Sequence, residues 1–216
     1  GLDTLVNVAN GLLQNAPEDE AKGVFELPTF ITSMVDKKWL GEKTKQGFYK
    51  KEKDAQGNSV ILSLDLKTLS YGEQKKIKSA TLEATKAVED IRKRMKVYEQ
   101  GADAAGALFR AMHYPLFEYV SNRVPEITDN FYRIDDAMRA GFGWELGPFE
   151  VWDALGVQET ISKIQAEEKR LPGQTGEVAA WVHEMLASGC ASFYKVIDGV
   201  KHYYDIPSKG YLPIPG

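Results

Sequence analysis

The residues of this sequence with the clearest potential for chemistry are glycines clustered between positions 141 and 156. Glycine-rich turns let the backbone approach a phosphate closely, so a nucleotide site is the first interpretation to test. Gly141, Gly143 and Gly147 have the spacing G-x-G-x-x-x-G, one residue longer than the dinucleotide fingerprint, and bulky Phe142 and Trp144 lie beside them. A helical pattern precedes the glycines, whereas the fingerprint needs a strand there. We therefore predict a tight turn between two packed helices.

A second glycine-containing loop carries two lysines and could resemble a phosphate-binding loop. Gly41 and Gly47 enclose Lys43 and Lys45, but the second glycine comes one residue too late for a Walker A loop and is followed by Phe48. Solvated lysines are the prediction for this loop.

Nucleophiles and metal ligands are few in this sequence. The one cysteine, Cys190, cannot form an internal disulfide, and no supporting residue lies near it in the sequence, so we expect a buried, inert thiol. The three histidines, His113, His183 and His202, have no ligand-like spacing to one another or to the cysteine. No metal site is expected.

Composition narrows the class of protein. The 216 residues suffice for one large or two small domains, and 43% of them are hydrophobic, enough for a real core. A net charge of -4 disfavours binding to nucleic acid or to a membrane surface. We identify no signal peptide and no apolar run long enough to span a bilayer, so we expect a soluble, cytoplasmic protein.

The glycine-rich segment also predicts the helix that follows the turn. Gly147 can cap that helix, Pro148 suits its first position, and Glu150 lies in the first turn at the positive end of the helix dipole. Gly156 then ends the helix. The helix should be buried because apolar residues cover much of its surface: Phe149, Val151, Trp152 and Leu155.

Helices and a hairpin are predicted in the first third of the chain. One helix is capped by Asp3 or Thr4, and a second is opened by Pro28 and closed by Gly41. The apolar faces of these helices are Leu5, Val8, Ala9 and Leu12, and Phe30, Ile31, Met34 and Val35. Residues 48–50 and 60–62 flank a polar turn and predict a small hairpin. The first helix begins so abruptly, without an initiator methionine, that we expect the chain to be a piece of a longer protein.

Further helices are predicted along the rest of the chain. A long one starts at Ser79 and stops at Gly101, with Glu89 and Lys93 spaced for an ion pair. The next covers about 104–123, with Pro115 as a kink. Leu108, Met112 and Tyr119 lie on one side of it. Shorter helices follow at 131–140, after Gly156 and at 179–186, and Asp198-Gly199 predicts a second, tighter hairpin.

A repeat emerges when the two ends of the chain are compared. Three pairs of segments carry it: residues 1–4 with 156–159, residues 30–34 with 181–185, and Phe48-Tyr49-Lys50 with Phe193-Tyr194-Lys195. The chain therefore holds the second half of one helical unit, a connector, and a complete second unit.

The motifs of the second unit resemble a known family. Asp135-Asp136-Ala137-Met138 followed by residues 141–156 resembles the C-terminal domain of 3-hydroxyacyl-CoA dehydrogenases. That family carries a glycine-rich turn, Gly-Pro-Phe-Glu, then Asp-x-x-Gly-Leu/Val, and ends in Lys-Thr-x-x-Gly-Phe-Tyr. Residues 43–49 supply the last motif for the first unit, and residues 192–194 are a weakened copy in the second. The resemblance covers essentially the whole chain and places Gly1 just past the Gly-Pro-Phe-Glu helix of the first unit.

The same resemblance implies which catalytic groups the chain lacks. The family transfers a hydride between a 3-hydroxyacyl thioester and NAD, using a histidine base and a glutamate that precede the helical units. An asparagine near the substrate carbonyl lies five residues before the proline of the kinked helix, where this chain has Arg110 and Pro115. Asn122 lies seven residues after that proline, so the role is not transferred to it. His113 and Glu118, five residues apart, should point to different helix faces.

The resemblance implies a role without catalysis for this segment. We expect no catalytic, cofactor-binding or metal residue, and interpret Gly141, Gly143, Gly147, Pro148, Phe149 and Glu150 as a structural motif. The segment would be the substrate-side and assembly part of an NAD-dependent 3-hydroxyacyl-CoA dehydrogenase of fatty acid β-oxidation, inactive alone. NAD would bind to an upstream nucleotide-binding domain, acyl-CoA would be the parent's substrate, and the closing stretch resembles a connector to an enoyl-CoA hydratase domain. The alternative is a stand-alone acyl-CoA-binding or protein-interaction helical module.

The expected architecture is mostly α-helical, with tandem units of this C-terminal type and two small β-hairpins. The expected boundaries are residues 1–63 for the half unit, 64–79 for the connector, 80–205 for the complete unit and 206–216 for a linker.

Overall fold

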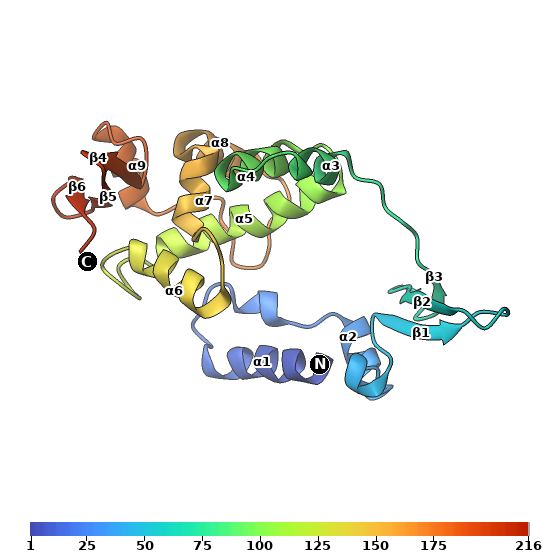
Figure 1. The fold of residues 1–216 in the computed structure, drawn as a ribbon. Helices are drawn as coiled ribbons and strands as arrows, with labels where there is room; N and C mark the ends of the chain where they lie inside the picture. The colour runs from blue at the N-terminus through green and yellow to red at the C-terminus, as the bar shows by residue number, and fades with distance from the viewer. Residues whose placement is uncertain (216) are drawn as a thin grey trace. The chain divides into compact units, whose positions relative to one another are not determined.

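The structure, a computed structural model, describes residues 1–215 and divides the chain into two compact units. Unit 1 is Gly1–Lys78 and unit 2 is Ser79–Gly216. Each combines helices with a three-stranded antiparallel sheet, as the ribbon in Figure 1 shows. The prediction of a mostly helical fold with two small β-structures is confirmed, and each predicted hairpin carries a third strand.

Unit 1 has two α-helices, two short 3-10 turns and one sheet among its described residues. They are α1 (Leu2–Asn15), the turns Lys22–Phe25 and Glu42–Thr44, α2 (Thr29–Asp36), β1 (Tyr49–Lys53), β2 (Ser59–Leu64) and β3 (Tyr71–Glu73). The strand order is β1-β2-β3, and β3 falls inside the segment expected to be a connector.

Both helices of unit 1 differ from the predicted ends. α1 begins directly after Gly1, not after a side-chain cap, because the Leu2 N–H donates to the carbonyl of Leu40 (3.0 Å). α2 ends at Asp36, five residues before the predicted Gly41. The chain turns there because Lys38 is left-handed, with a φ of 58°.

The core of unit 1 is small and includes only part of the predicted apolar faces. Its buried members are Leu2, Ile31, Met34 and Leu64. On α1, the predicted face is wrong for Leu5, Val8 and Leu12, which are exposed, while Ala9 is buried. A complete apolar stripe of α1 therefore faces away from this core.

Unit 2 contains most of the helices and the second sheet. Its elements are α3 (Ala80–Lys86), α4 (Ile91–Gln100), α5 (Ala104–Asn122), α6 (Tyr132–Phe142), α7 (Pro148–Leu155), α8 (Val157–Ala166), α9 (Ala180–Ala187), β4 (Tyr194–Ile197), β5 (Val200–Asp205) and β6 (Gly210–Pro213). β6 pairs with β5 inside the stretch that was expected to be a linker.

The predicted helix from residue 79 to 101 is wrong in one respect, because it is two helices. Ser79 caps the first of them with its side chain, as predicted. Asp90 caps the second by accepting the N–H groups two and three residues further on, at 2.8 and 3.1 Å. Glu89 consequently lies between the helices, so the predicted helical pairing with Lys93 is also wrong.

α5 has nearly the predicted bounds, and its buried face is not the one that carries Leu108 and Met112. These two side chains are 61% and 58% exposed. The buried face carries Phe109 and Phe117 instead. α5 continues through Pro115 without ending.

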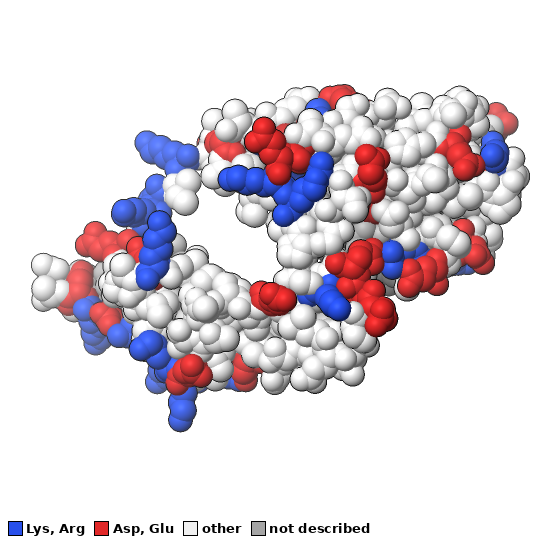
Figure 2. Space-filling view, turned by 180° about the vertical axis from the view of Figure 1, so that it is seen from behind, with Lys and Arg blue, Asp and Glu red and all other residues white. Residues whose placement is uncertain are grey.

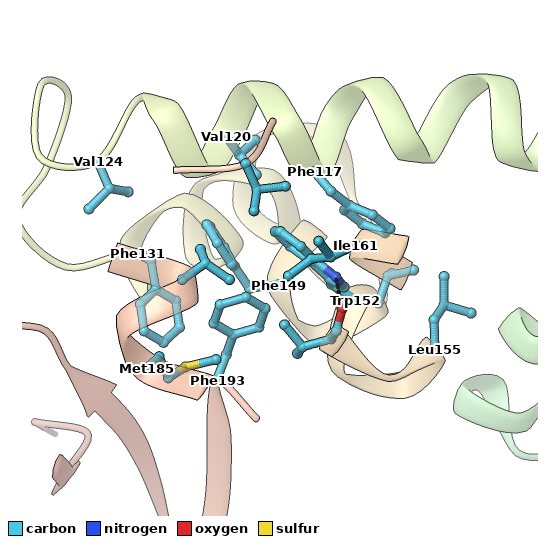
Figure 3. Packing of buried hydrophobic residues seen from close by; sticks show 14 of the residues in the cluster. Phe117, Val120, Val124, Phe131, Phe149, Trp152, Leu155, Ile161, Met185 and Phe193 are labelled. Carbon is cyan, nitrogen blue, oxygen red and sulfur yellow. Dashed lines mark hydrogen bonds between the residues drawn. The ribbon is translucent and has the colours of Figure 1, made fainter. Parts of the chain in front are cut away.

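Aromatic side chains fill the core of unit 2. Phe131, Phe149, Phe193 and Met185 gather in one group, and Trp152 lies beside them beneath α5 (Figure 3). The Phe149 ring lies 4.9 Å from that of Phe131 and 4.9 Å from that of Phe193, centroid to centroid. α7 is therefore enclosed on several sides, and the prediction of a buried helix is confirmed.

The second sheet follows the predicted turn. Ile197 pairs with Val200, and Asp198 and Gly199 between them both have positive φ, 50° and 78°. This is the backbone that a two-residue hairpin with the strand twist requires.

The surface shows both signs of charge. On the face seen in Figure 2, acidic and basic side chains are interspersed, and lysines follow one another between β3 and α3. Among the residues that the structure describes, no helix combines the length and apolar composition needed to cross a bilayer.

Candidate functional site

The glycine-rich run forms a turn and a buried helix, as predicted. α6 continues through Gly141, and Gly143 ends it in the left-handed conformation, with a φ of 67°. Gly147 then caps α7, and Pro148 occupies its first position. α6 and α7 pack against each other on either side of this turn.

Gly147 is required by the closeness of α6. A Cβ atom at this position would overlap the Cα, Cβ and Cγ atoms of Asp135. Gly141, in contrast, has open space around the place of its Cβ and an ordinary helical backbone. The glycines of the run therefore have different roles, and only close packing explains the one at position 147.

Replacing Gly147 with alanine is expected to lower the free energy of unfolding by about 2 kcal/mol, because the added methyl group overpacks the α6–α7 contact. Gly141→Ala is the matched control, and it should leave stability unchanged or raise it by up to about 1 kcal/mol through better helix propensity. Urea denaturation of both variants measures the difference. Equal stability of the two variants would contradict the role given to Gly147.

Asp135 is the side chain that Gly147 makes room for, and it closes the N-terminus of α7. Its carboxylate accepts the N–H groups of Phe149 (2.9 Å) and Glu150 (3.1 Å) and the hydroxyl of Tyr194 (2.7 Å). Burial raises the pKa of Asp135 to about 7, although these hydrogen bonds act in the opposite direction. Burial, together with the neighbouring Asp135, also raises the pKa of the Tyr194 hydroxyl.

Glu150 lies in the first turn of α7 and joins several elements. One oxygen of its carboxylate accepts the Gly147 N–H (3.0 Å), and the other accepts the Lys201 ammonium from β5 (2.6 Å). Arg139 of α6 forms an ion pair with it, and Arg92 of α4 donates to its backbone carbonyl (3.3 Å). Only 4% of the Glu150 side chain is exposed. Burial alone would raise its pKa, but the bonds from Lys201 and Gly147 and the nearby cations outweigh burial and lower it.

Asp153, one turn further along α7, holds the start of the second sheet. Its two oxygens accept the backbone N–H groups of Phe193 (2.7 Å) and Tyr194 (2.8 Å). Burial raises the pKa of Asp153 to about 7. The three carboxylates of this cluster thus connect α7 to α6, to α4 and to the sheet.

The cluster does not fit a dinucleotide. A phosphate at a helix N-terminus needs free backbone donors and a positive field. At α7 these donors are bonded to the carboxylates of Asp135 and Glu150, whose charge would repel a phosphate. A helix, α6, precedes the turn instead of a strand. These contacts support the expectation that the motif binds no dinucleotide, which stays a prediction.

The raised pKa values predict how stability depends on pH. Asp135 and Asp153 titrate near 4 when unfolded, so between about pH 4 and 7 the native chain keeps protons that the unfolded chain has released. The free energy of unfolding should therefore fall as the pH rises through that window. Burial lowers the pKa of His113, so this group alone would make the free energy of unfolding rise with pH near pH 6. Its effect is smaller than that of the two aspartates together, because it is a single group. Urea midpoints should be higher at about pH 5 than at about pH 8.

Asp153→Asn supplies the check on this pH dependence. The variant is expected to be less stable throughout, and its midpoint should change less between the two pH values than that of the original chain. An equal or larger change in the variant would show that other groups cause the dependence.

His113, Glu118 and Cys190 each have contacts of their own in unit 2. His113 stacks on Phe109, with ring centroids 3.9 Å apart, and its Nδ1 lies 2.9 Å from the Phe109 carbonyl. Glu118 instead accepts N–H groups of Thr175 and Gly176 at 2.6 and 3.1 Å, so the two side chains have different partners. Cys190 is half-buried at the edge of the core, less enclosed than expected. Among the described residues, no group of three histidine, cysteine or acidic side chains could hold a metal ion.

Arg110 and Asn122 serve the backbone around them. The Arg110 guanidinium donates to the carbonyls of Glu99 (2.6 Å) and Gly101 (2.8 Å), and Asn122 donates to the carbonyls of Glu118 and Glu177 (2.9 and 3.2 Å). Arg110 also borders a hollow of about 310 Å³ between α5, α8 and the loop after α8.

Sequence reasoning found the residues of the motif but missed the partners of its carboxylates. The sequence identified Asp135 and Asp153 only as parts of the family motif. In the structure, each carboxylate accepts backbone N–H groups from residues distant in the sequence. Lys201, on a strand, gave no signal that could have linked it to α7. The assignment of the motif as structural, with no catalytic residue in the segment, stays a prediction.

Comparison with known proteins identifies similar sequences. Residues 109–196 match the family described as 3-hydroxyacyl-CoA dehydrogenase, C-terminal domain. The chain is 40% identical over 205 residues to the "Probable 3-hydroxyacyl-CoA dehydrogenase" of Bacillus subtilis (strain 168). The aligned residues make up 95% of this chain and 24% of that protein. No solved structure matches the chain.

Two more distant relatives carry a different name. Both are called "Putative fatty acid oxidation complex trifunctional enzyme", from Rickettsia felis (27% identical) and Rickettsia prowazekii (22% identical). Each similarity extends over 152 residues, 70% of this chain and 19% of the relative. The chain therefore spans about a quarter or less of the length of the curated relatives it matches.

Proposed function

We propose that this chain, which contains a 3-hydroxyacyl-CoA dehydrogenase C-terminal domain over residues 109–196, is the substrate-side and assembly segment of an NAD-dependent 3-hydroxyacyl-CoA dehydrogenase of fatty acid β-oxidation. The observation that carries the proposal is the 40% identity over nearly the whole chain to a protein named as such a dehydrogenase. The names of the more distant relatives support the assignment to fatty acid oxidation.

The parent enzyme would oxidise the 3-hydroxyl group of an acyl-CoA thioester. A hydride passes from C3 to NAD and the hydroxyl proton passes to a base, which leaves 3-oxoacyl-CoA, NADH and a proton. NAD and the base would be held by an upstream nucleotide-binding domain of the same polypeptide. The helices of this chain would help to enclose the acyl chain and exclude water from the hydride path.

The arrangement of charged groups in unit 2 supports a role in assembly rather than in chemistry. The buried carboxylates Asp135, Glu150 and Asp153 are bonded to backbone donors, and Glu150 also to cations. His113 is stacked and bonded to its own helix. These side chains are thus engaged in contacts that join the elements of unit 2. A cytoplasmic location and a downstream enoyl-CoA hydratase domain are further parts of the proposal.

An activity assay tests the proposal. The isolated chain and the same chain joined to the upstream domain of its parent are mixed with NAD and a 3-hydroxyacyl-CoA, and NADH formation is followed. We expect turnover by the joined protein and none by the isolated chain. Turnover by the isolated chain would refute the assembly role, and no turnover by either protein would refute the assignment to a dehydrogenase.

A second candidate function is a stand-alone acyl-CoA-binding helical module. The hollow beside Arg110 favours it, because Ala111, Pro115 and Ile164 line an apolar wall and Lys169 adds a cation at the same place. Calorimetry with an acyl-CoA separates the two functions. Tight binding by the isolated chain would favour the module, and weak or absent binding would favour a segment whose site is completed by another domain.

A further inference from the structure

The hollow beside Arg110 lies within unit 2 and is separate from the carboxylate cluster. α5 forms one wall, and the end of α8 with the loop that follows it, residues 167–179, forms the other. The volume of about 310 Å³ falls at the lower end of the range for pockets that bind small molecules. The lining does not include Asp135, Glu150 or Asp153, so the hollow needs an explanation of its own.

The wall formed by α5 carries an apolar strip of small side chains. Ala107, Ala111 and Pro115 of this strip lie four residues apart, so they follow one another along one side of the helix over about 12 Å. Ile164 of α8 and Leu171 of the loop also line the hollow. Leu171 is 48% exposed, so apolar surface at this place is in contact with solvent. A narrow apolar strip of this length suits a linear alkyl chain.

The charged side chains of the hollow are mostly cations. Arg110, Lys169 and Arg170 line it together with a single carboxylate, that of Glu167. Arg170 donates to two carbonyls at the end of α8 (3.3 and 3.2 Å). Among the residues that the structure describes, none of the three cations forms an ion pair with a carboxylate. The hollow therefore carries a net positive charge and favours an anion.

The guanidinium of Arg110 is held in place with donors to spare. Its Nη1 atom donates to the carbonyls of Glu99 (2.6 Å) and Gly101 (2.8 Å). Within the described part of the chain, its Nε and Nη2 atoms have no acceptor. Arginine presents its N–H groups in a planar fork that matches a carboxylate. Two donor groups beside the hollow are thus oriented by the protein and left for a ligand.

The loop wall of the hollow is fastened to α5. Glu118, which is 5% exposed, accepts the N–H groups of Thr175 (2.6 Å) and Gly176 (3.1 Å) and the hydroxyl of Thr175 (3.0 Å). A Cβ atom on Gly176 would overlap the Arg170 guanidinium, so the two ends of this part of the loop lie against each other. A wall held in this way makes the hollow preformed, which lowers the entropic cost of binding.

A second, larger hollow of about 700 Å³ adjoins the first, and Arg110 and Lys169 line both. Three carboxylates line it together with three cations, so it offers no net attraction to a polyanion such as coenzyme A. These side chains are Glu99, Glu167 and Glu168, and Arg110, Lys163 and Lys169. The charge pattern favours a ligand with one negative group that ends near Arg110.

We propose that the hollow between α5, α8 and the loop after α8 is a binding site for a small alkyl carboxylate. The carboxylate accepts the unused N–H groups of Arg110 and lies close to Lys169, and the alkyl chain lies along the apolar strip of α5. The site requires neither NAD nor another domain. It differs from the second candidate function because its ligand has a free carboxylate and no coenzyme.

Calorimetry with sodium octanoate, octan-1-ol and octanoyl-CoA, each below its micelle concentration, tests the site. We expect octanoate to bind the chain with a Kd below about 1 mM. Octanol should bind at least about tenfold more weakly, because it cannot form the charge-assisted bonds to Arg110. Octanoyl-CoA should also bind more weakly. The affinity for octanoate should fall as salt is added, since salt screens the attraction to the cations.

Variants with matched controls locate the ligand. Ala111→Phe should weaken octanoate binding at least about tenfold, because the added ring occupies the apolar strip. Leu108→Phe adds bulk to the same helix at an exposed position outside the lining, and it should bind octanoate like the original chain. Lys169→Met should weaken binding about threefold, and Lys93→Met, at an exposed position of α4, should leave it unchanged.

Several outcomes would overturn the proposal. Absence of octanoate binding would do so directly, and equal affinity for octanol would remove the role of the cations. Full affinity in Ala111→Phe, with an unchanged circular dichroism spectrum, would place the ligand elsewhere. Tighter binding of octanoyl-CoA than of octanoate would favour the second candidate function instead. Since none of these measurements follows NADH formation, a failure here is distinguishable from a failure of the dehydrogenase assignment.

Discussion

Replacing Trp152 with alanine is expected to lower the free energy of unfolding of unit 2 by about 4 kcal/mol. The indole is fully buried, stacks on Phe117 at 5.1 Å and contacts Phe193 at 5.0 Å, and its N–H donates to the carbonyl of Val157 (3.4 Å). Truncation would leave a large cavity at the centre of the core, where α5, α7 and α8 meet. Urea denaturation followed by circular dichroism measures the loss.

Phe142→Ala is the matched control for this experiment. Phe142 is also aromatic and lies close in sequence, but it is 75% exposed, so its removal should change stability by less than about 0.5 kcal/mol. Trp152→Phe, which keeps a ring in the core, should fall between the two and remains measurable if the alanine variant does not fold. A loss for Trp152→Ala no larger than that for Phe142→Ala would contradict the packing described here.

Replacing Glu150 with glutamine is expected to cost about 3 kcal/mol, because it removes the charge that balances Arg139 and Lys201 at a buried site. Glutamine has nearly the same shape and can still accept the Gly147 N–H, so the loss reports mainly on charge. The expected loss lies at the low end for a broken buried ion pair because the cations themselves reach solvent: the Arg139 and Lys201 side chains are 32% and 38% exposed.

Glu145→Gln provides the control for Glu150, since it makes the same chemical change at an exposed position of the preceding turn. It should leave the urea midpoint nearly unchanged. A double variant that also changes Lys201 to methionine should recover part of the loss, because it removes one of the unbalanced cations. Additive losses in that double variant would mean that the two side chains do not act on each other.

Elements with strong local signals could be predicted from the sequence. The capping Gly147 and the first-position Pro148 mark the start of α7, Gly156 marks its end, and the structure places them there. Asp198 and Gly199 adopt the positive φ values that their residue types favour, so the second hairpin also follows from local chemistry. In both cases the conformation depends on a few consecutive residues.

The sequence could not predict which side of a helix is buried when apolar residues lie on two of its sides. α5 has apolar residues on two sides, and the aromatic side, with Phe109 and Phe117, is the one buried against α7 and α8. The spacing of Leu108 and Met112 is equally helical, so periodicity alone could not choose. The third strands were missed because β3 and β6 are short and pair across longer connections.

The contacts of the carboxylate cluster could not be predicted from the sequence either. The family resemblance is confirmed by the comparisons, and it drew attention to the segments that hold Asp135, Glu150 and Asp153. Their partners come from other elements, such as Tyr194 and Lys201, and only the fold brings these together. A sequence motif therefore located this cluster without revealing what it does.

The overlap between Gly147 and Asp135 also constrains how this motif can change. A Cβ atom at position 147 would overlap the backbone Cα atom of Asp135 as well as its side chain, so a smaller residue at position 135 would not make room and α6 itself would have to shift. A smaller residue there would also leave the N–H groups of Phe149 and Glu150 and the hydroxyl of Tyr194 without their acceptor. Each of the two substitutions is therefore expected to destabilise the chain, and neither compensates for the other, so Gly147 and Asp135 can be exchanged only together with a change in the packing of α6 against α7.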